Sequence, residues 1–252
     1  EKYQERLNNV DIHIARYKKA GMSIPQAFMN ERRKVIEAFV AEFLDTPYTV
    51  ATRADFISKM QEIGCSQKQI DSAINALSEY SIPGFYVRGQ MFFITDDIVD
   101  IEDARQTLVH ERQHYLTSKD RARLTNAVLE SVDSVEELDK VVENLSETDL
   151  YVGEDADVLA DEFLSFAMQI AYTDANFAEI LKEKGVNDKL ITLITEINNE
   201  QANQESLSKA RRGRGRNVYG SQSSNRSSKQ DGGNQTAQSA RVEEQGPGFT
   251  ET

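Results

Sequence analysis

One stretch of this chain, GFYVRGQMFFIT (residues 84–95), is rich in aromatic and β-branched residues on both sides of RGQ, which predicts a β-hairpin. Most of the first 200 residues carry the periodicity of amphipathic helices instead. One hairpin among many helices predicts a mainly α architecture with a small hairpin or sheet, of the α+β class. Helices are expected at residues 1–20, 25–44, 52–64, 66–80, 120–131, 134–146, 156–172 and 186–200, and from Asp100 or Ile101 onwards.

Charge and composition limit the kinds of partner. The net charge is −13, and residues 1–200 carry −16, because residues 201–252 hold eight Lys/Arg and five Asp/Glu. Such an acidic body argues against broad electrostatic binding to nucleic acid or to an anionic membrane. The single cysteine, Cys65, excludes an intrachain disulfide and a cysteine-rich zinc site. No apolar run approaches the roughly 20 residues of a membrane span, so we expect a protein without a membrane anchor.

Residues 201–252 consist largely of Gly, Ser, Gln, Asn and Arg, with almost nothing to bury. Such a segment cannot offset the entropy lost on ordering, so we expect a disordered tail. Its basic cluster KARRGRGR (209–216) fits a flexible linker best, and any contact with nucleic acid through it would be weak.

The sequence HERQH (residues 110–114) contains two of the three histidines of the chain. On a helix, residues four apart project from the same face one turn apart, so His110 and His114 can bind one zinc ion, at about 2.0–2.1 Å each. Glu111 can reach a water on that ion without being a ligand, and can act as general base. The alternative is a charged helix face that carries two histidines by chance. The third histidine, His13, lies far upstream and is read as structural or surface.

The stretch LVHERQH (108–114) resembles the active-site helix of the HExxH zincin metallopeptidases, in particular the glutamate-type (gluzincin-like) group. It looks most like the zincin-like domains of large polyvalent proteins from phages and mobile elements. The resemblance covers about residues 84–172 and includes, less specifically, DVLADEFLSFA (157–167). It implies a zincin-like fold, with an active-site helix beside a small sheet and a later helix that carries a ligand. The chain then divides into an N-terminal helical segment (1–50), a zincin-like metallopeptidase domain (51–200, core 84–172) and the tail (201–252).

The resemblance implies a glutamate as third zinc ligand, because HYLTSKDRARL lacks the glycine and histidine of the extended metzincin motif. The candidate is Glu162, on a helix that is apolar almost all round, where a carboxylate needs a cation or strong hydrogen bonds. Asp161 is the adjacent alternative, and it stays open whether this helix supplies a ligand at all. Three nearby acidic residues look like a solvated loop and helix start: Glu154, Asp155 and Asp157.

Peptidases of this kind use a side chain to stabilise the oxyanion, often Tyr, His or Arg. Tyr151, Tyr115 and Arg112 are available, and the sequence does not distinguish them; for Tyr151 the simpler role is a loop aromatic that covers the core.

The expected function is that of a zinc-dependent metallopeptidase, in which His110, His114 and Glu162 hold Zn²⁺ and Glu111 is the general base that activates water. The alternative is a catalytically idle, zincin-shaped interaction or structural module of a phage or mobile-element protein. A winged-helix DNA binder also fits two helices followed by a hairpin, but residues 51–95 hold four Lys/Arg and four Asp/Glu, hence no net positive charge.

The expected partner is a peptide or protein substrate, or a larger parent polypeptide or virion assembly. The expected location is cytoplasmic, or virion-associated with delivery into a host cell.

Overall fold

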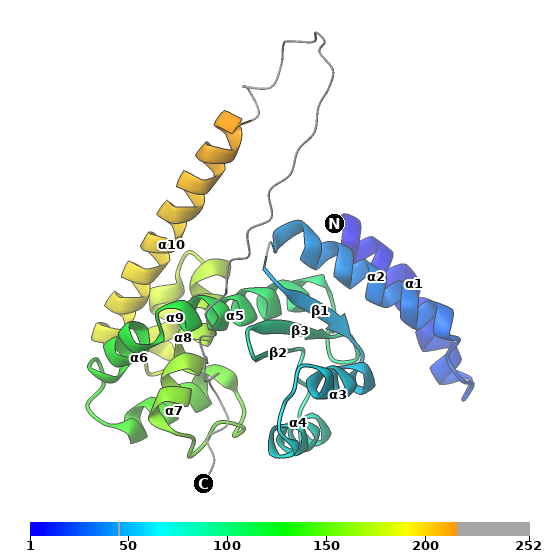
Figure 1. The fold of residues 1–252 in the computed structure, drawn as a ribbon, viewed down its shortest axis with the longest axis horizontal. Helices are drawn as coiled ribbons and strands as arrows, with labels where there is room; N and C mark the ends of the chain where they lie inside the picture. The colour runs from blue at the N-terminus through cyan, green and yellow to red at the C-terminus, as the bar shows by residue number, and fades with distance from the viewer. Residues whose placement is uncertain (45, 216–252) are drawn as a thin grey trace, which may run out of the picture. The chain divides into compact units, whose positions relative to one another are not determined.

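The computed structural model describes residues 1–44 and 46–215, with side chains described as far as residue 203. This part of the chain is mainly helical, with one small sheet (Figure 1). The elements follow in the order α1 (Lys2–Lys19), α2 (Gln26–Phe43), β1 (Tyr48–Ala51), α3 (Arg53–Glu62), α4 (Gln67–Glu79), β2 (Gly84–Val87), β3 (Gln90–Ile94), α5 (Ile101–Lys119), α6 (Arg121–Leu129), α7 (Val135–Ser146), α8 (Ala156–Thr173), α9 (Phe177–Glu183) and α10 (Asp188–Gly215). The mainly α, α+β fold class is therefore confirmed.

Local capping explains where several helices begin. The Thr52 side chain accepts a hydrogen bond from the Asp55 N–H at the start of α3, and Ser66 forms a capping box with Gln69 at the start of α4. Gly64, with φ +79°, follows the end of α3 in the left-handed conformation that favours glycine. Asp100 accepts from the Asp103 N–H and starts α5. The caps predicted at Thr52 and Ser66 are confirmed.

The sheet has three strands in the order β1-β3-β2. β2 and β3 form the expected antiparallel hairpin, whose turn residues Arg88 and Gly89 both have positive φ (50° and 81°), as a type I′ turn requires. β1 pairs in parallel with β3, with Tyr48 opposite Met91. Because β3 lies in the centre, β2 is an edge strand among the described residues.

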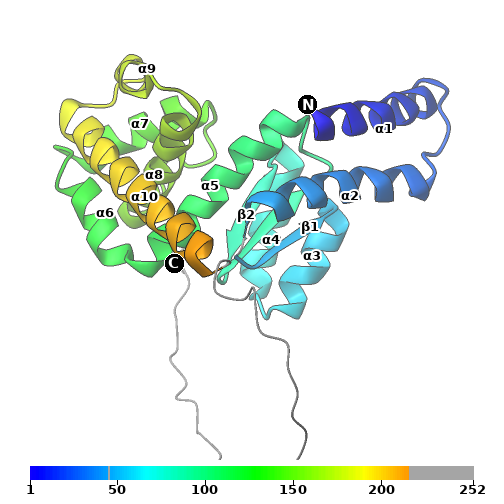
Figure 2. The ribbon, with the colours of Figure 1, turned by 90° about the horizontal axis from the view of Figure 1, so that it is seen from above.

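Helices cover both faces of the sheet. Met91 and Phe93 of β3 point to one face and pack in a core with α1, α2 and α5. Phe92 and Ile94 point to the other face and pack with residues of α3 and α4. Figure 2 shows α5 running between the sheet and the group formed by α6 to α9. Since the first core includes Leu7 and Val35, the N-terminal helices α1 and α2 pack against the sheet and α5.

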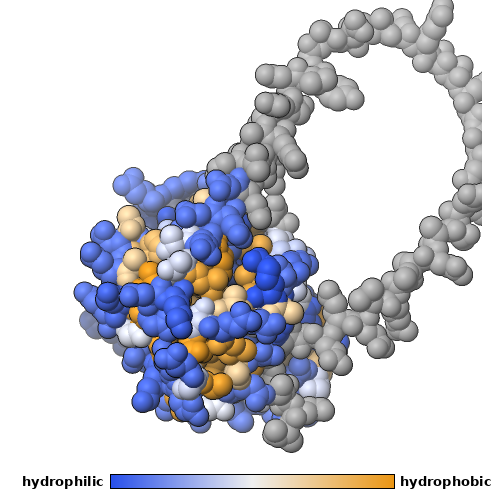
Figure 3. Space-filling view, turned by 90° about the vertical axis from the view of Figure 1, so that its left-hand side faces the viewer, coloured by the Kyte–Doolittle hydropathy of each residue, from blue (hydrophilic) through white to orange (hydrophobic). Residues whose placement is uncertain are grey.

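On its other side α5 packs against α8, which is the centre of a second helical layer with α6, α7 and α9. α8 buries Leu159, Phe163, Leu164 and Ala167 completely. The surface of this part is mostly polar, with apolar side chains gathered in the middle of the face drawn in Figure 3. None of the described helices combines the length and the apolar character that crossing a membrane requires.

The chain divides into two units after Thr195. Residues 1–195 form the first, and the described part of the second is the remainder of α10, to Gly215. The helix thus continues beyond residue 200, where composition predicted the disordered tail to begin. The Gln, Glu, Ala, Lys and Arg residues at 201–212 are good helix formers, which explains the difference. The rest of the predicted tail, 216–252, lies outside the described residues.

Candidate metal centre

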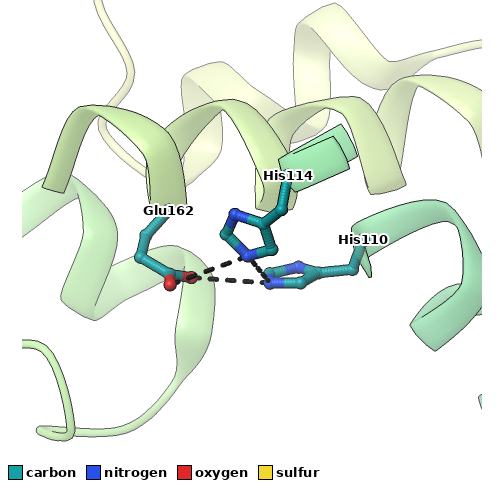
Figure 4. A group of neighbouring side chains, drawn as sticks. All are labelled: His110, His114 and Glu162. Atoms are coloured by element: carbon teal, nitrogen blue, oxygen red, sulfur yellow. Dashed lines mark hydrogen bonds and ion pairs between the residues drawn. The ribbon is translucent and has the colours of Figure 1, made fainter. Parts of the chain in front are cut away.

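Two packed helices bring three candidate ligands together. His110 and His114 project from α5 towards α8, where Glu162 faces them (Figure 4). The Nε2 atoms of the two imidazoles lie 3.2 Å apart. Glu162 Oε2 lies 3.4 Å from His110 Nε2, and Glu162 Oε1 lies 3.7 Å from His114 Nε2. The structure therefore contains a His/His/Glu group that could hold a metal ion, with both histidines buried.

The donor atoms have the spacing of ligands that share one ion. Two atoms that each bind a tetrahedral zinc ion at about 2.0–2.1 Å are separated by about 3.3 Å. The separation of the imidazole nitrogens, 3.2 Å, agrees with this value. In addition, Glu162 Oε2 is buried without a hydrogen-bond partner among the described residues. A buried carboxylate oxygen in that state needs a cation, so the residues present fit a divalent metal.

Asp161 has a different position from the one considered in the sequence. Its Oδ2 lies 3.2 Å from His114 Nδ1, the nitrogen that points away from His110 and Glu162. The Ser165 hydroxyl lies at 3.2 Å from the same nitrogen. If Nδ1–H donates to Asp161, Nε2 keeps its lone pair for a metal. Asp161 thus orients His114, and Glu162 is the carboxylate that could hold a metal ion together with the two histidines.

The ring planes of both histidines are fixed by aromatic neighbours. His110 packs edge-on against Phe166 of α8, with ring centroids 4.5 Å apart. His114 lies parallel to Tyr86 of β2 at 6.1 Å. Tyr86 in turn donates a hydrogen bond to the Ser118 hydroxyl at 2.9 Å. His110 is therefore held from α8, and His114 is held from the sheet side.

Glu111 is 4% exposed, and its Oε2 has no hydrogen-bond partner among the described residues. Burial raises the pKa of Glu111 to about 7, against the opposing charges of His110 and His114. Its carboxylate lies beside Gly84 on the edge strand β2. A Cβ added at Gly84 would come within 2.5 Å of Glu111 Oε1 and within 2.6 Å of Thr107 Cγ2. The absence of a side chain at residue 84 makes room for the proposed base.

Carboxylates also hold a proton on His114 in the absence of a metal. Burial alone lowers the pKa of an imidazole, but the charges of Asp161 and Glu162 outweigh it and raise the pKa of His114 to about 10. A divalent cation at Nε2 would take the place of that proton.

Of the three oxyanion candidates, only Tyr151 lies at the site. It lines the cavities described next, and burial first, then the charge of Glu162, raises the pKa of its hydroxyl well above the usual value. Tyr115 packs in the sheet-side core, under Lys119, and Arg112 does not line either cavity.

His13 stacks on Phe28 in the α1–α2 hairpin, which agrees with a structural role. Glu154, Asp155 and Asp157 are exposed, as the sequence predicted.

Two cavities meet at the candidate site. The ligand-side cavity contains His114 and Glu162 and extends to Arg121 and Val158. The second cavity lies towards the start of α5, along Thr107, Gln106 and Gln169. Both are lined by Gly84, His110, Glu111 and Tyr151. Neither Gly84 nor Arg121 could be assigned to the site from the sequence, because tertiary packing places both residues there.

Replacing Gly84 with alanine is expected to lower the free energy of unfolding by about 1–3 kcal/mol, because the new methyl group overlaps Glu111 and Thr107. Urea denaturation measures the loss. The control is the same substitution in a Glu111→Ala background, where two of the three nearest atoms are gone and the loss should be smaller. Equal losses in both backgrounds would show that the close contact with Glu111 does not matter.

Comparisons with known proteins gave no relative for this chain: no protein-family model matches it, and no curated protein or solved structure does either. Its chemistry must therefore be inferred from its own residues.

Proposed function

We propose that this protein is a zinc-dependent metallopeptidase of the zincin kind. The observation that carries the proposal is the His110, His114 and Glu162 group, whose ligand atoms all lie within 4.8 Å of one another, with the buried carboxylate of Glu111 on the next residue of the same helix. Two histidines and a glutamate are one of the ligand sets of catalytic zinc, which keeps a fourth position for water or substrate. When bound, the metal would polarise the peptide carbonyl and make water more acidic.

The side chains around this position suit the two proton transfers of peptide hydrolysis. With a pKa of about 7, Glu111 can accept a proton from the attacking water near neutral pH and pass it to the leaving amine. The Tyr151 hydroxyl, beside Glu162, is placed to donate a hydrogen bond to the oxygen that gains negative charge. Asp161 keeps the Nδ1 proton of His114 in place.

The edge strand offers a place for an extended peptide. Ile94 N–H donates to the Pro83 carbonyl at 2.8 Å, so Pro83, Phe85 and Val87 direct their backbone groups to β3. The alternate residues, Gly84 and Tyr86, therefore direct their backbone groups away from β3, where no described strand pairs with them. An extended peptide can bind such an edge by strand addition. Gly84 is also the residue beside Glu111, so a peptide there would pass the proposed base.

Metal analysis tests the proposal directly. The purified protein is expected to bind one zinc ion per chain, and His110→Ala, His114→Ala and Glu162→Ala should each lose it or bind it far more weakly. Cleavage of an unfolded protein such as casein should stop when a chelator removes the metal and return when zinc is added. A chain that binds no zinc, or that binds zinc but cleaves neither casein nor a peptide library, is not the peptidase proposed. The second outcome would instead fit the idle module.

We also propose that the substrate is a peptide or protein, including a parent polypeptide or mobile-element assembly of which the chain could be a part, and that it acts in the cytoplasm or with a virion. The edge of β2 would accept an extended segment in any of these settings.

A further inference from the structure

The ligand-side cavity has one cationic side chain in its wall besides the two histidines, as far as the described residues go. Arg121 is the first residue of α6 and is partly buried. The apolar part of the wall includes Ile82, Leu150 and Val158. An arginine beside an apolar wall of this kind can bind a negatively charged group of a ligand with little competition from water.

Arg121 has no carboxylate partner within the described part of the chain. Arg121 differs in this respect from two arginines with structural roles. Arg32 binds Asp11 at 2.8 Å, and Arg53 binds the buried Asp97. No ion pair joins Arg121 to an acidic side chain of the same cavity wall in the described part of the chain. Asp161 and Glu162 face the histidines, and no ion pair joins Glu154 to Arg121. The guanidinium is thus available to a ligand.

We propose that Arg121 binds a carboxylate of the substrate, which is either the C-terminal carboxylate of a peptide or the side chain of Asp or Glu. This inference rests on the proposed peptidase function and assigns its substrate class. Without Arg121 the only cationic groups at the cavity wall, as far as the described residues go, would be the metal-site histidines and their ion, against four acidic side chains, Glu111, Glu154, Asp161 and Glu162, which disfavours such a substrate. Planar guanidinium groups bind carboxylates with two parallel hydrogen bonds, which fixes the position of the peptide as well as its charge.

Three pools of random hexapeptides test the proposal. The first pool has free C-termini and no Asp or Glu, the second has amidated C-termini and includes Asp and Glu, and the third has amidated C-termini and neither acid. The zinc-loaded chain should cleave one of the first two pools about 10- to 100-fold faster than the third, the factor expected for a charge-assisted hydrogen bond. The preferred pool identifies the source of the carboxylate.

Arg121→Gln should remove that preference, so that the variant cleaves the preferred pool no faster than the third pool. The control is Arg123→Gln on the same helix, which removes an exposed arginine paired with Asp120 and should behave like the wild type. Equal cleavage of all pools by the wild type, or a preference that survives in Arg121→Gln, would overturn the role of Arg121 and leave the peptidase proposal intact.

Binding gives a second readout that needs no turnover. The zinc-loaded Glu111→Gln variant should bind the preferred pool about 10- to 100-fold more tightly than the third pool, measured by calorimetry. The additional substitution Arg121→Gln should abolish the difference. Equal binding of all pools contradicts the inference about Arg121. Absence of cleavage by the wild type, by contrast, contradicts the peptidase proposal whatever the binding result.

Discussion

Glu111→Gln is expected to lower kcat for peptide cleavage by about 10²- to 10⁴-fold, the usual contribution of a general base. The amide has the shape of the carboxylate but cannot accept a proton at neutral pH. Because Glu111 is not among the three residues whose donor atoms converge, zinc content should stay at the wild-type level. Steady-state kinetics and metal analysis of the same preparation measure both quantities.

The matched control is Glu102→Gln, which changes an exposed glutamate in the first turn of the same helix. It should retain wild-type turnover. A Glu111→Gln variant that cleaves as fast as the wild type would rule out this residue as the base, and loss of zinc from the variant would mean that the substitution disturbs the ligands instead.

The same substitution should stabilise the metal-free protein. The pKa of Glu111 is raised from 4.5 to about 7, so the folded state favours the neutral form and loses stability as the pH rises through this range. A difference of that size corresponds to about 3 kcal/mol at most, and the neutral amide avoids the loss. A residue that costs stability in the resting protein is what a functional role would explain.

The parts of the fold that depend on neighbouring residues could be predicted from the sequence. Thr52, Ser66 and Asp100 cap their helices because a side-chain oxygen reaches an N–H three residues ahead. β1 (Tyr48–Ala51) was not predicted, because four residues are too few for a periodic pattern and its parallel partner, β3, lies some forty residues away. The helix α9 (Phe177–Glu183) was not predicted either, because it is too short to show a periodic pattern.

The candidate site also has residues that could be predicted from the sequence and residues that could not. The spacing of His110 and His114 is a property of one helix, and Glu162 was indicated by a carboxylate on an apolar helix. Sequence alone could not separate Glu162 from Asp161, because the rotation of α8 against α5 decides which carboxylate faces Nε2 and which faces Nδ1. It could not select Tyr151 over Tyr115 or Arg112 either, since the approach of the loop before α8 to the cavities is a tertiary feature.

Zinc binding is expected to weaken about tenfold for each unit by which the pH falls below neutrality, because one proton must leave His114 for each ion bound. Without a metal, Asp161 and Glu162 keep this imidazole protonated, with a pKa of about 10. The sign follows from that direction. A histidine whose pKa is raised in the folded state stabilises the fold fully below its usual value of 6.5, and this stabilisation is lost as the pH rises towards 10.

The metal-free protein should therefore become less stable from acidic to alkaline pH, through Glu111 first and His114 later, whereas the zinc-bound protein should gain stability over metal-free protein in the same direction. At a free zinc concentration about 1,000 times the dissociation constant, the gain is about 4 kcal/mol. Thermal unfolding at pH 6, 7 and 8, with and without zinc, measures both trends.

Glu162→Gln should reduce the zinc-dependent gain at every pH, since it removes the charge of the third ligand, while Glu102→Gln should not. A zinc effect that is independent of pH, or that survives unchanged in His114→Ala, would mean that the ion binds elsewhere, because His114 is the group on which the proton and the metal compete.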